Sequence, residues 1–221
     1  MPEFDTGYAL SPSEIIYLNA DRFAKPARLG YRPLAAEGKV NATQLGQAVA
    51  AAAILALEAS GAAKLELEET RRFLLKVRHV RMTPLGGRSN FPEPCLEESL
   101  HEVTRRLASS ANAVFVKDIV FGWIGEDTEQ SITDLLDAVP RYLAERGLAT
   151  RTQEKRVKVF TVTDYELPST TRELADRARA DRVQALLADC ERDRPDLATQ
   201  LMREVRQPFS SGSGSDAVDF D

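Results

Sequence analysis

The stretch ITDLLDAVPRYLAERGLATRTQEKRVKVFTV, which runs from Ile132 to Val162, decides the fold that this sequence predicts. Its first half places apolar residues at positions i, i+3, i+4, i+7 and i+11, the spacing that forms one buried stripe along a helix. These residues are Ile132, Leu135, Leu136, Val139 and Leu143. Gly147 then supplies the residue type that most readily adopts the left-handed conformation at a helix end. We therefore expect the helix to end there.

The residues after this glycine predict a β-hairpin. Leu148 to Arg151 and Arg156 to Thr163 have strand-like composition, and the polar run Thr152 to Lys155 has the length of a common hairpin loop. Pro140 lies inside the helical pattern, where it removes one backbone hydrogen bond and favours a kink. A helix, a glycine and a hairpin in this order are typical of a winged-helix unit.

Capping signals and apolar spacing predict further helices around this unit. Ser11, Pro12 and Glu14 form a capping box with proline at the first helical position. Asn41 opens an alanine-rich helix that is expected to run to Glu58 and to lie at the centre of the fold. Further helices are predicted over Leu96 to Leu107, Thr170 to Arg192 and Leu197 to Val205, and a short apolar segment covers Phe115 to Trp123.

Two alternating stretches, Lys64 to Glu68 and Leu75 to Arg78, predict the strands of a second small sheet, with a bulge at His79. Two stretches rich in proline and glycine, Lys25 to Val40 and Thr83 to Pro94, are predicted to be loops. The sequence thus predicts a mostly α (α+β) fold, a helical domain with small β-hairpins and a winged-helix-like core.

One domain is predicted over residues 1–206, and its last helices, within 171–206, either belong to the same core or form an appendage. Residues 207–221 are rich in serine, glycine and aspartate and have too little apolar surface to offset the entropy of ordering. We expect this tail to be disordered.

Composition narrows the classes of function. The 221 residues are 43% hydrophobic, and no apolar run approaches the roughly 20 residues that cross a bilayer. The start, Met1 to Asp5, lacks the basic and apolar regions of a secretory signal, which favours a cytoplasmic location. The net charge of −5 and the pI near 5.3 argue against a protein that coats nucleic acid.

Motifs for catalysis and metal binding are missing from the sequence. Cys95 and Cys190 form no CxxC pair, and His79 and His101 have no second ligand at short spacing. The sequence contains no G-x-S-x-G, P-loop, G-x-G-x-x-G after a strand, or H-E-x-x-H. We therefore expect a non-enzymatic protein with no catalytic residues, no metal and no cofactor.

Two groups of basic residues stand out against the acidic chain. One surrounds the second predicted strand and comprises Arg71, Arg72, Lys76, Arg78, Arg81 and Arg88. The other decorates the hairpin and comprises Arg151, Lys155, Arg156 and Lys158. Either group could meet phosphates on a lipid or a nucleic acid. The alternative is that both are ordinary polar faces of half-exposed strands. Trp123, among apolar neighbours, is interpreted as a core anchor.

Over about Leu10 to Arg179 the order of these elements resembles the Golgi phosphoprotein 3 family. Four stretches carry the resemblance: LSPSEIIYL from Leu10, the small-residue helix and strand of Ile54 to Glu68, PCLEESL from Pro94, and LAERGLAT from Leu143 with the hairpin and LPSTT that follow. The alanine- and arginine-rich composition indicates a divergent, bacterial-type member.

The resemblance implies a cytosolic peripheral membrane protein that binds phosphatidylinositol 4-phosphate and helps to retain Golgi glycosyltransferases. The family's lipid pocket uses a tryptophan and an arginine near the small-residue helix, and two arginines on the helix before the glycine. In this chain Leu45, Gly46 and Gln47 stand at the first place, and Asp134 and Asp137 stand at the second. The hairpin tip is charged, which favours electrostatic contact over insertion.

The sequence therefore predicts a non-enzymatic adaptor, cytoplasmic and peripheral to the membrane, that binds anionic phospholipid headgroups. The residues expected to bind lipid are Arg141, Arg151, Lys155, Arg156 and Lys158. Client proteins are the other expected partners, and a homo-oligomer stays open. Two alternatives remain, a winged-helix regulator that binds DNA through the hairpin and a protein-interaction scaffold without a lipid ligand.

Overall fold

The computed structural model describes residues 10–72, 75–86, 89–124, 132–156 and 160–210. This part of the chain is mostly helical, with two small antiparallel sheets, so the predicted α+β class is confirmed. The helices are α1 Pro12–Leu18, η1 Ala20–Arg22 (3-10), α2 Ala42–Ala59, α3 Leu96–Ala108, α4 Val116–Ile124, α5 Ile132–Glu145, α6 Ser169–Arg177, α7 Ala180–Asp193 and α8 Pro195–Ser210. The strands are β1 Pro26–Tyr31, β2 Ala63–Arg72, β3 Leu75–Pro84, β4 Thr150–Arg156 and β5 Phe160–Glu166.

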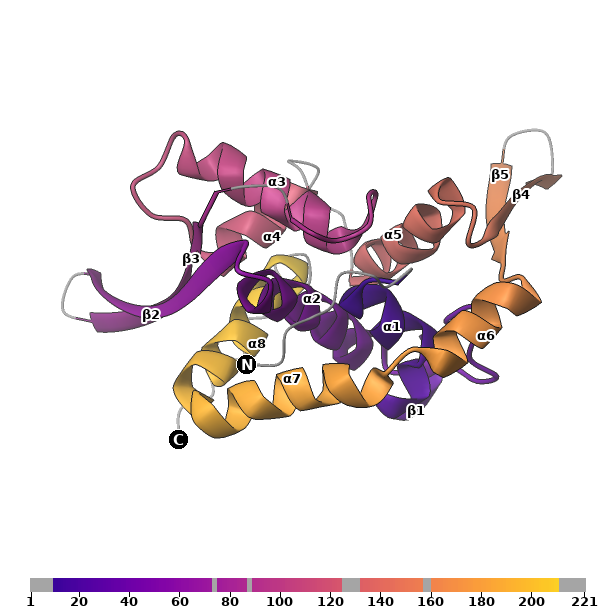
Figure 1. The fold of residues 1–221 in the computed structure, drawn as a ribbon, viewed down its shortest axis with the longest axis horizontal. Coiled ribbons are helices and arrows are strands. Elements are labelled where there is room, and N and C mark those ends of the chain that lie inside the picture. Colours follow the sequence, from indigo (N-terminus) through magenta and orange to yellow (C-terminus); the bar gives the residue numbers. More distant parts are fainter. Residues whose placement is uncertain (1–9, 73–74, 87–88, 125–131, 157–159, 211–221) are drawn as a thin grey trace.

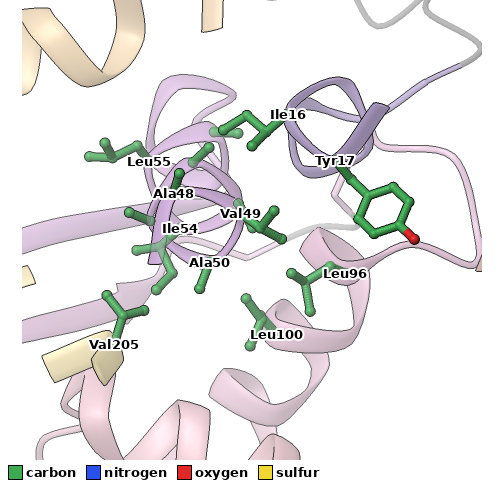
Figure 2. Close-up of a cluster of buried hydrophobic side chains, with 14 of the residues drawn as sticks. Ile16, Tyr17, Ala48, Val49, Ala50, Ile54, Leu55, Leu96, Leu100 and Val205 are labelled. Carbon is green, nitrogen blue, oxygen red and sulfur yellow. The ribbon is translucent and has the colours of Figure 1, made fainter. Parts of the chain in front are cut away.

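Helix α2 is the centre of the fold. Asn41 caps it by accepting a hydrogen bond from the backbone N–H of Gln44 at 2.9 Å. Every residue from Ala48 to Leu57 is buried, and Figure 2 shows side chains of α1, α3 and α8 packed around it. The alanine-rich sequence lets these helices approach on several sides, as predicted. Gly46 extends this close packing to α5, because a Cβ atom there would lie 2.4 Å from Ile132 Cγ1.

Helix α1 is fixed to the core by its capping groups. The backbone N–H of Ser11 donates to Glu14 Oε2 at 2.8 Å, which confirms the predicted capping box. Glu97 of α3 accepts hydrogen bonds from the backbone N–H and the hydroxyl of Ser13, at 2.8 and 2.9 Å. Because Glu97 is fully buried, this contact satisfies the free N–H groups of α1 from a second helix.

The two hairpins lie at opposite ends of the molecule, as Figure 1 shows. Strands β2 and β3 pair from Ala63 opposite Pro84 to Arg72 opposite Leu75. The ladder passes through His79, which lies opposite Glu68 in a continuous register, so the predicted bulge is wrong. The strands are also longer than predicted, because polar and charged residues continue the alternation on the exposed face.

The second hairpin differs from its prediction in register. Helix α5 ends before Gly147, whose φ of +73° confirms the predicted helix end, and Pro140 lies inside the helix. The run Thr152 to Lys155, predicted as a loop, belongs to β4, which pairs with β5 from Thr150 opposite Glu166 to Arg156 opposite Phe160. Polarity alone misplaced the turn, because a hairpin that stands in solvent can carry polar residues on both faces.

The C-terminal helices pack on the same core. Leu197, Leu201 and Val205 of α8 are buried, and the helix contacts α2, α4 and β3. The predicted single helix from Thr170 to Arg192 is wrong, since α6 ends at Arg177 and α7 begins at Ala180. Ala175 and Ala180 are both buried, whereas one continuous helix would turn them about 140° apart. The predicted tail starts at Gln207, but α8 runs to Ser210, and residues 211–221 lie outside the described residues.

The stretch predicted as a loop from Lys25 to Val40 contains one short strand. β1 forms isolated bridges from Pro26 and from Tyr31 to Val40. The bridges close this stretch on itself beside α1, and it is therefore more regular than its proline and glycine content indicated.

Candidate functional site

Hairpin β4–β5 projects from the end of α5, and its base is firmly attached. The backbone N–H of Leu148 donates to Leu143 O at 2.8 Å, and the hydroxyl of Thr171 donates to Leu148 O at 2.7 Å. Ala149 and Leu167, at the start and end of the hairpin, are buried. Beyond them the hairpin leaves the helical body (Figure 1). The base is therefore part of the core, whereas the outer half is available for a partner.

Charges are distributed unevenly along this hairpin. Asp164 and Glu166 lie near the base, opposite Thr152 and Thr150. The basic residues Lys155 and Arg156 lie at the outer end of β4, opposite Thr161 and Phe160, and the acidic residue Glu154 precedes them, opposite Val162.

Arg151 is exposed near the base, opposite Tyr165. Lys158, also predicted to bind lipid, lies outside the described residues. The structure thus places three of the predicted residues on one strand, with the two outermost farthest from the acidic base.

A cleft of about 880 Å³ opens at the foot of the hairpin, between β5, α5, α3 and the residues that follow β1. It brings together side chains that are far apart in the sequence. Its charged lining consists of Arg32, Arg106 and Arg141 together with Glu102, Asp134, Asp137 and Asp164. Four carboxylates face three guanidinium groups, so the cleft is a mixed-charge site, not a simple anion pocket.

Two tyrosines connect the wall of the cleft to the core. The Tyr31 hydroxyl donates to Asp137 Oδ1 at 2.7 Å and lies 3.1 Å from the Tyr17 hydroxyl. Burial raises the pKa of Tyr31 well above its usual range, and burial raises the pKa of Tyr17 to about 12. Both hydroxyls therefore stay protonated at neutral pH, and Asp137 is held as an acceptor.

The predicted residue Arg141 lies on the exposed face of α5 in this cleft. Its guanidinium carbon stands 5.2 Å from the centre of the Tyr142 ring, a cation–π contact that leaves the hydrogen-bond donors free to face the cleft. Arg106 is partly engaged, since its Nη2 donates to Gly122 O at 3.1 Å. Arg32 and Arg141 form no ion pair with the described residues.

Sequence reasoning missed Arg32 and Arg106, because nothing in the spacing of residues 32, 106 and 141 indicates that the fold joins them. In the sequence, each is simply a charged residue next to an apolar stretch, and the structure shows both to be exposed. Trp123, interpreted as a core anchor, is half-buried: it packs against the core and also lines the cleft.

The basic group around β3 is partly neutralised by ion pairs. Lys76 contacts Glu69 at 2.7 Å, and Arg78 contacts Asp196 of α8 at 3.0 Å. Arg81 pairs with Glu68 at 3.4 Å. Arg88 lies outside the described residues. Three members of this group are therefore paired, whereas Arg71, which is exposed, forms no ion pair with a residue that the structure describes.

The described residues offer little for other classes of site. They contain no group of three side chains suited to hold a metal ion. Cys95 and Cys190 are both buried, and burial raises the pKa of each thiol. Within this part of the chain α2 is the single helix long and apolar enough to cross a membrane, but the surrounding helices cover it.

Comparisons with known proteins leave the chain without a demonstrated relative. No family model matches it, and neither a search of curated proteins nor a search of solved structures gives a match.

Proposed function

We propose that this protein is a non-enzymatic peripheral membrane adaptor that binds anionic phospholipid headgroups through the outer half of hairpin β4–β5. The observation that carries the proposal is the position of Lys155 and Arg156 at the outer end of β4, where Glu154 is the one acidic neighbour on the strand, whereas Asp164 and Glu166 lie near the base. A winged-helix-like core related to the Golgi phosphoprotein 3 family is part of the same proposal, and it rests on the helix, glycine and hairpin order.

The electrostatics of a membrane surface support this choice. Each lysine or arginine close to an anionic leaflet contributes about 1 kcal/mol of attraction. Lys155, Arg156 and Lys158 follow one another within four positions, with valines between and after them in the sequence. Basic residues interspersed with apolar ones are typical of segments that lie at the headgroup level. The acids of the base are held away by the length of the strands, and three basic residues outnumber the single acid beside them, Glu154.

The cleft has a lesser part in lipid binding. Arg141 faces the cleft together with Asp134 and Asp137, and a phosphate group there would meet these carboxylates at short range. Like charges that are forced together in a cleft oppose binding. We therefore assign the lipid contact to Arg151, Lys155, Arg156 and Lys158, with Arg141 contributing less than any residue near the turn.

The DNA-binding alternative is less well supported. In a winged helix, α5 would be the candidate to enter the major groove. Its exposed positions carry Asp134, Asp137 and Glu145 and only one arginine, Arg141. A helix with this charge repels the phosphates on either side of the groove. The scaffold alternative predicts no binding to lipid vesicles or to DNA. The vesicle experiment below distinguishes it from the membrane proposal.

Co-sedimentation with vesicles tests the proposal directly. Wild type is compared with Arg151→Glu/Lys155→Glu/Arg156→Glu on neutral vesicles, phosphatidylserine or cardiolipin vesicles, and phosphatidylinositol 4-phosphate vesicles. The control is Lys64→Glu/Lys76→Glu/Arg78→Glu on hairpin β2–β3, which changes the net charge equally at exposed, paired positions.

We expect wild type to bind anionic vesicles, and the β4 variant to bind on the order of 100-fold more weakly. The control variant should lose much less, because only the overall charge changes. Equal loss in both variants would show that binding has no defined face, and salt-dependent binding to duplex DNA but not to vesicles would favour the DNA alternative. Preference for the phosphoinositide would identify a headgroup-specific contact.

A further inference from the structure

One leucine is far more exposed than any other large apolar side chain of the described residues. Leu29, in the middle of β1, is 90% exposed, followed by Leu85 at 55% and Phe121 at 39%. Holding a leucine in water forgoes the stabilisation that burial would give. An isolated exposed leucine is common on protein surfaces, so its surroundings decide whether it has a role.

The backbone around Leu29 is held in place on both sides. Pro26 and Tyr31 bridge to Val40, and the backbone N–H of Ala27 donates to Lys39 O at 2.9 Å. Gly30 lies so close to this segment that a Cβ atom would stand 2.2 Å from Val40 O. Val40 itself is buried in the core. Leu29 is therefore presented outward by an anchored strand, and its exposure is set by the fold.

The charged residues around Leu29 are predominantly basic. Between residues 25 and 39 the chain contains four basic residues and one acidic residue, Glu37. The basic residues are Lys25, Arg28, Arg32 and Lys39, all of them exposed. None of the four forms an ion pair with a residue that the structure describes. Arg32 also lines the mixed-charge cleft with Asp134 and Asp137, so the positive surface beside Leu29 consists mainly of Lys25, Arg28 and Lys39.

This strand lies in the same half of the molecule as hairpin β4–β5. Tyr31 and Arg32, which follow Leu29, line the cleft together with Thr163 and Tyr165 of β5. Figure 1 shows β1 at the lower side of this half and the hairpin at its upper side, with β2–β3 at the opposite end of the molecule. The segment after β1 thus meets the foot of the hairpin at the cleft, while Leu29 itself forms a separate exposed element.

We propose that Leu29 and its basic neighbours form a second membrane-contact element, in which Leu29 enters the headgroup region of an anionic bilayer while Lys25 and Arg28 meet lipid phosphates. This inference rests on the proposed membrane function and adds a specific apolar contact to it. Basic side chains that flank an apolar anchor suit a membrane interface, because their long stems reach the headgroups while the anchor lies deeper.

A bilayer fits this element better than a protein partner does. Specific protein interfaces bury about 1,200 Å² or more and have a contiguous apolar centre. A single leucine surrounded by flexible charged chains provides no such centre, whereas a fluid lipid surface needs none.

The test uses substitutions at Leu29 and, as matched controls, at Leu85. The backbone N–H of Leu85 donates to Ala62 O, just beyond the C-terminal end of α2, whereas β1 lies before the N-terminal end of this helix. The length of α2 therefore separates Leu85 from β1. Leu29→Ser and Leu85→Ser are compared with wild type on phosphatidylserine vesicles. Leu29→Cys and Leu85→Cys are labelled with a thiol-reactive, environment-sensitive fluorophore. The labelling is selective for the introduced cysteine because both native cysteines are buried.

We expect Leu29→Ser to bind about tenfold more weakly than wild type, as follows from the loss of one interfacial leucine. Leu85→Ser should bind like wild type. The Leu29 probe should shift to the blue with vesicles, and the Leu85 probe should not. If wild type binds vesicles, Leu29→Ser binds them equally well and the Leu29 fluorophore shows no blue shift, this inference is overturned. The proposed membrane function of the hairpin would be unaffected by that result. If wild type binds no vesicle, the proposed function and this inference both fall.

Discussion

The two hairpins use the same residue types in different arrangements. In β2–β3, lysines and arginines alternate with glutamates, and Lys76 and Arg81 each have an acidic partner on the neighbouring strand. In β4–β5 the acids Asp164 and Glu166 lie near the base with Arg151, whereas Lys155 and Arg156 lie farther out beside Glu154. The first arrangement sets basic residues directly against acidic ones, and the second separates Lys155 and Arg156 from the acids of the base. The two hairpins therefore differ in where their charges lie along the strands.

The hairpins also differ in how they are held. The carboxylate of Glu204, buried on α8, accepts hydrogen bonds from Val80 N, His79 Nδ1 and Gln200 Nε2 at 3.2, 2.9 and 2.9 Å. This contact joins β2–β3 to the body halfway along its length. Hairpin β4–β5 is bonded at its base. A strand pair that is attached only at its base can meet a partner over more of its length than one that is joined to the body halfway along.

The largest expected effect is the loss of the Glu204 contact. Glu204→Ala leaves the buried Val80 N–H and the His79 ring without their acceptor, which should lower the free energy of unfolding by about 4 kcal/mol. Urea unfolding followed by circular dichroism measures it. Glu204→Gln keeps one acceptor oxygen and should lose clearly less. If the alanine variant is as stable as wild type, β2–β3 is not held by α8.

A contact at the end of α5, just before β4, should make the free energy of unfolding depend on pH. Arg146, at the end of α5, forms a buried ion pair with Glu14 of α1. Burial raises the pKa of Glu14 from 4.5 to about 7, although Arg146 opposes the shift. Because the folded-state pKa exceeds the unfolded one, this contribution to stability is fully present below pH 4.5 and is lost as the pH rises through 7.

From this shift we expect the free energy of unfolding to fall by about 3 kcal/mol between pH 4.5 and pH 8, apart from other titrating groups. Glu14→Gln cannot ionise and should flatten this part of the profile. Urea titrations of both proteins at several pH values measure the difference. Parallel profiles for wild type and Glu14→Gln would show that the carboxyl group is ionised throughout and that Arg146 outweighs burial.

The sequence predicted those parts of the fold that local chemistry determines. The ends of α2 and α5 follow from Asn41 and Gly147, whose capping roles depend on neighbouring residues only. The break between α6 and α7 at Ala178 has no glycine or proline to mark it in the sequence. It arises because Ala175 and Ala180 are both buried on the core. Local patterns could not indicate it.

The candidate site shows the same limit. Arg151, Lys155 and Arg156 were predicted because they are neighbours on one strand. Arg32 and Arg106 join the cleft only through the packing of β1, α3 and α5, and the carboxylates that change its character come from separate elements as well. The net charge of a pocket is a property of the tertiary structure, so the sequence could name candidate residues but could not predict what surrounds them.

A smaller effect is expected at the base of β4–β5. Thr171→Val removes the hydroxyl that donates to Leu148 O and leaves this carbonyl without that partner, which should lower the free energy of unfolding by about 1 kcal/mol. The volume of the side chain is nearly unchanged. Thr152→Val is the control: it removes a hydroxyl that donates to Asp164 O at 3.3 Å at an exposed position, where water replaces the bond, and it should have little effect. Hydrogen exchange of the β4 amides should rise in Thr171→Val alone if this bond holds the hairpin to the body.

The smallest effect is expected on the surface of β2–β3. Lys76→Ala removes one exposed ion pair, and exposed pairs contribute about 0 to 1 kcal/mol because water and salt screen them. We expect a change within about 0.5 kcal/mol that disappears at high salt. The informative comparison is with Lys155→Ala, which should also leave stability unchanged and yet weaken vesicle binding, whereas Lys76→Ala should affect neither. If both variants weaken vesicle binding alike, the difference in charge arrangement between the two hairpins has no functional meaning.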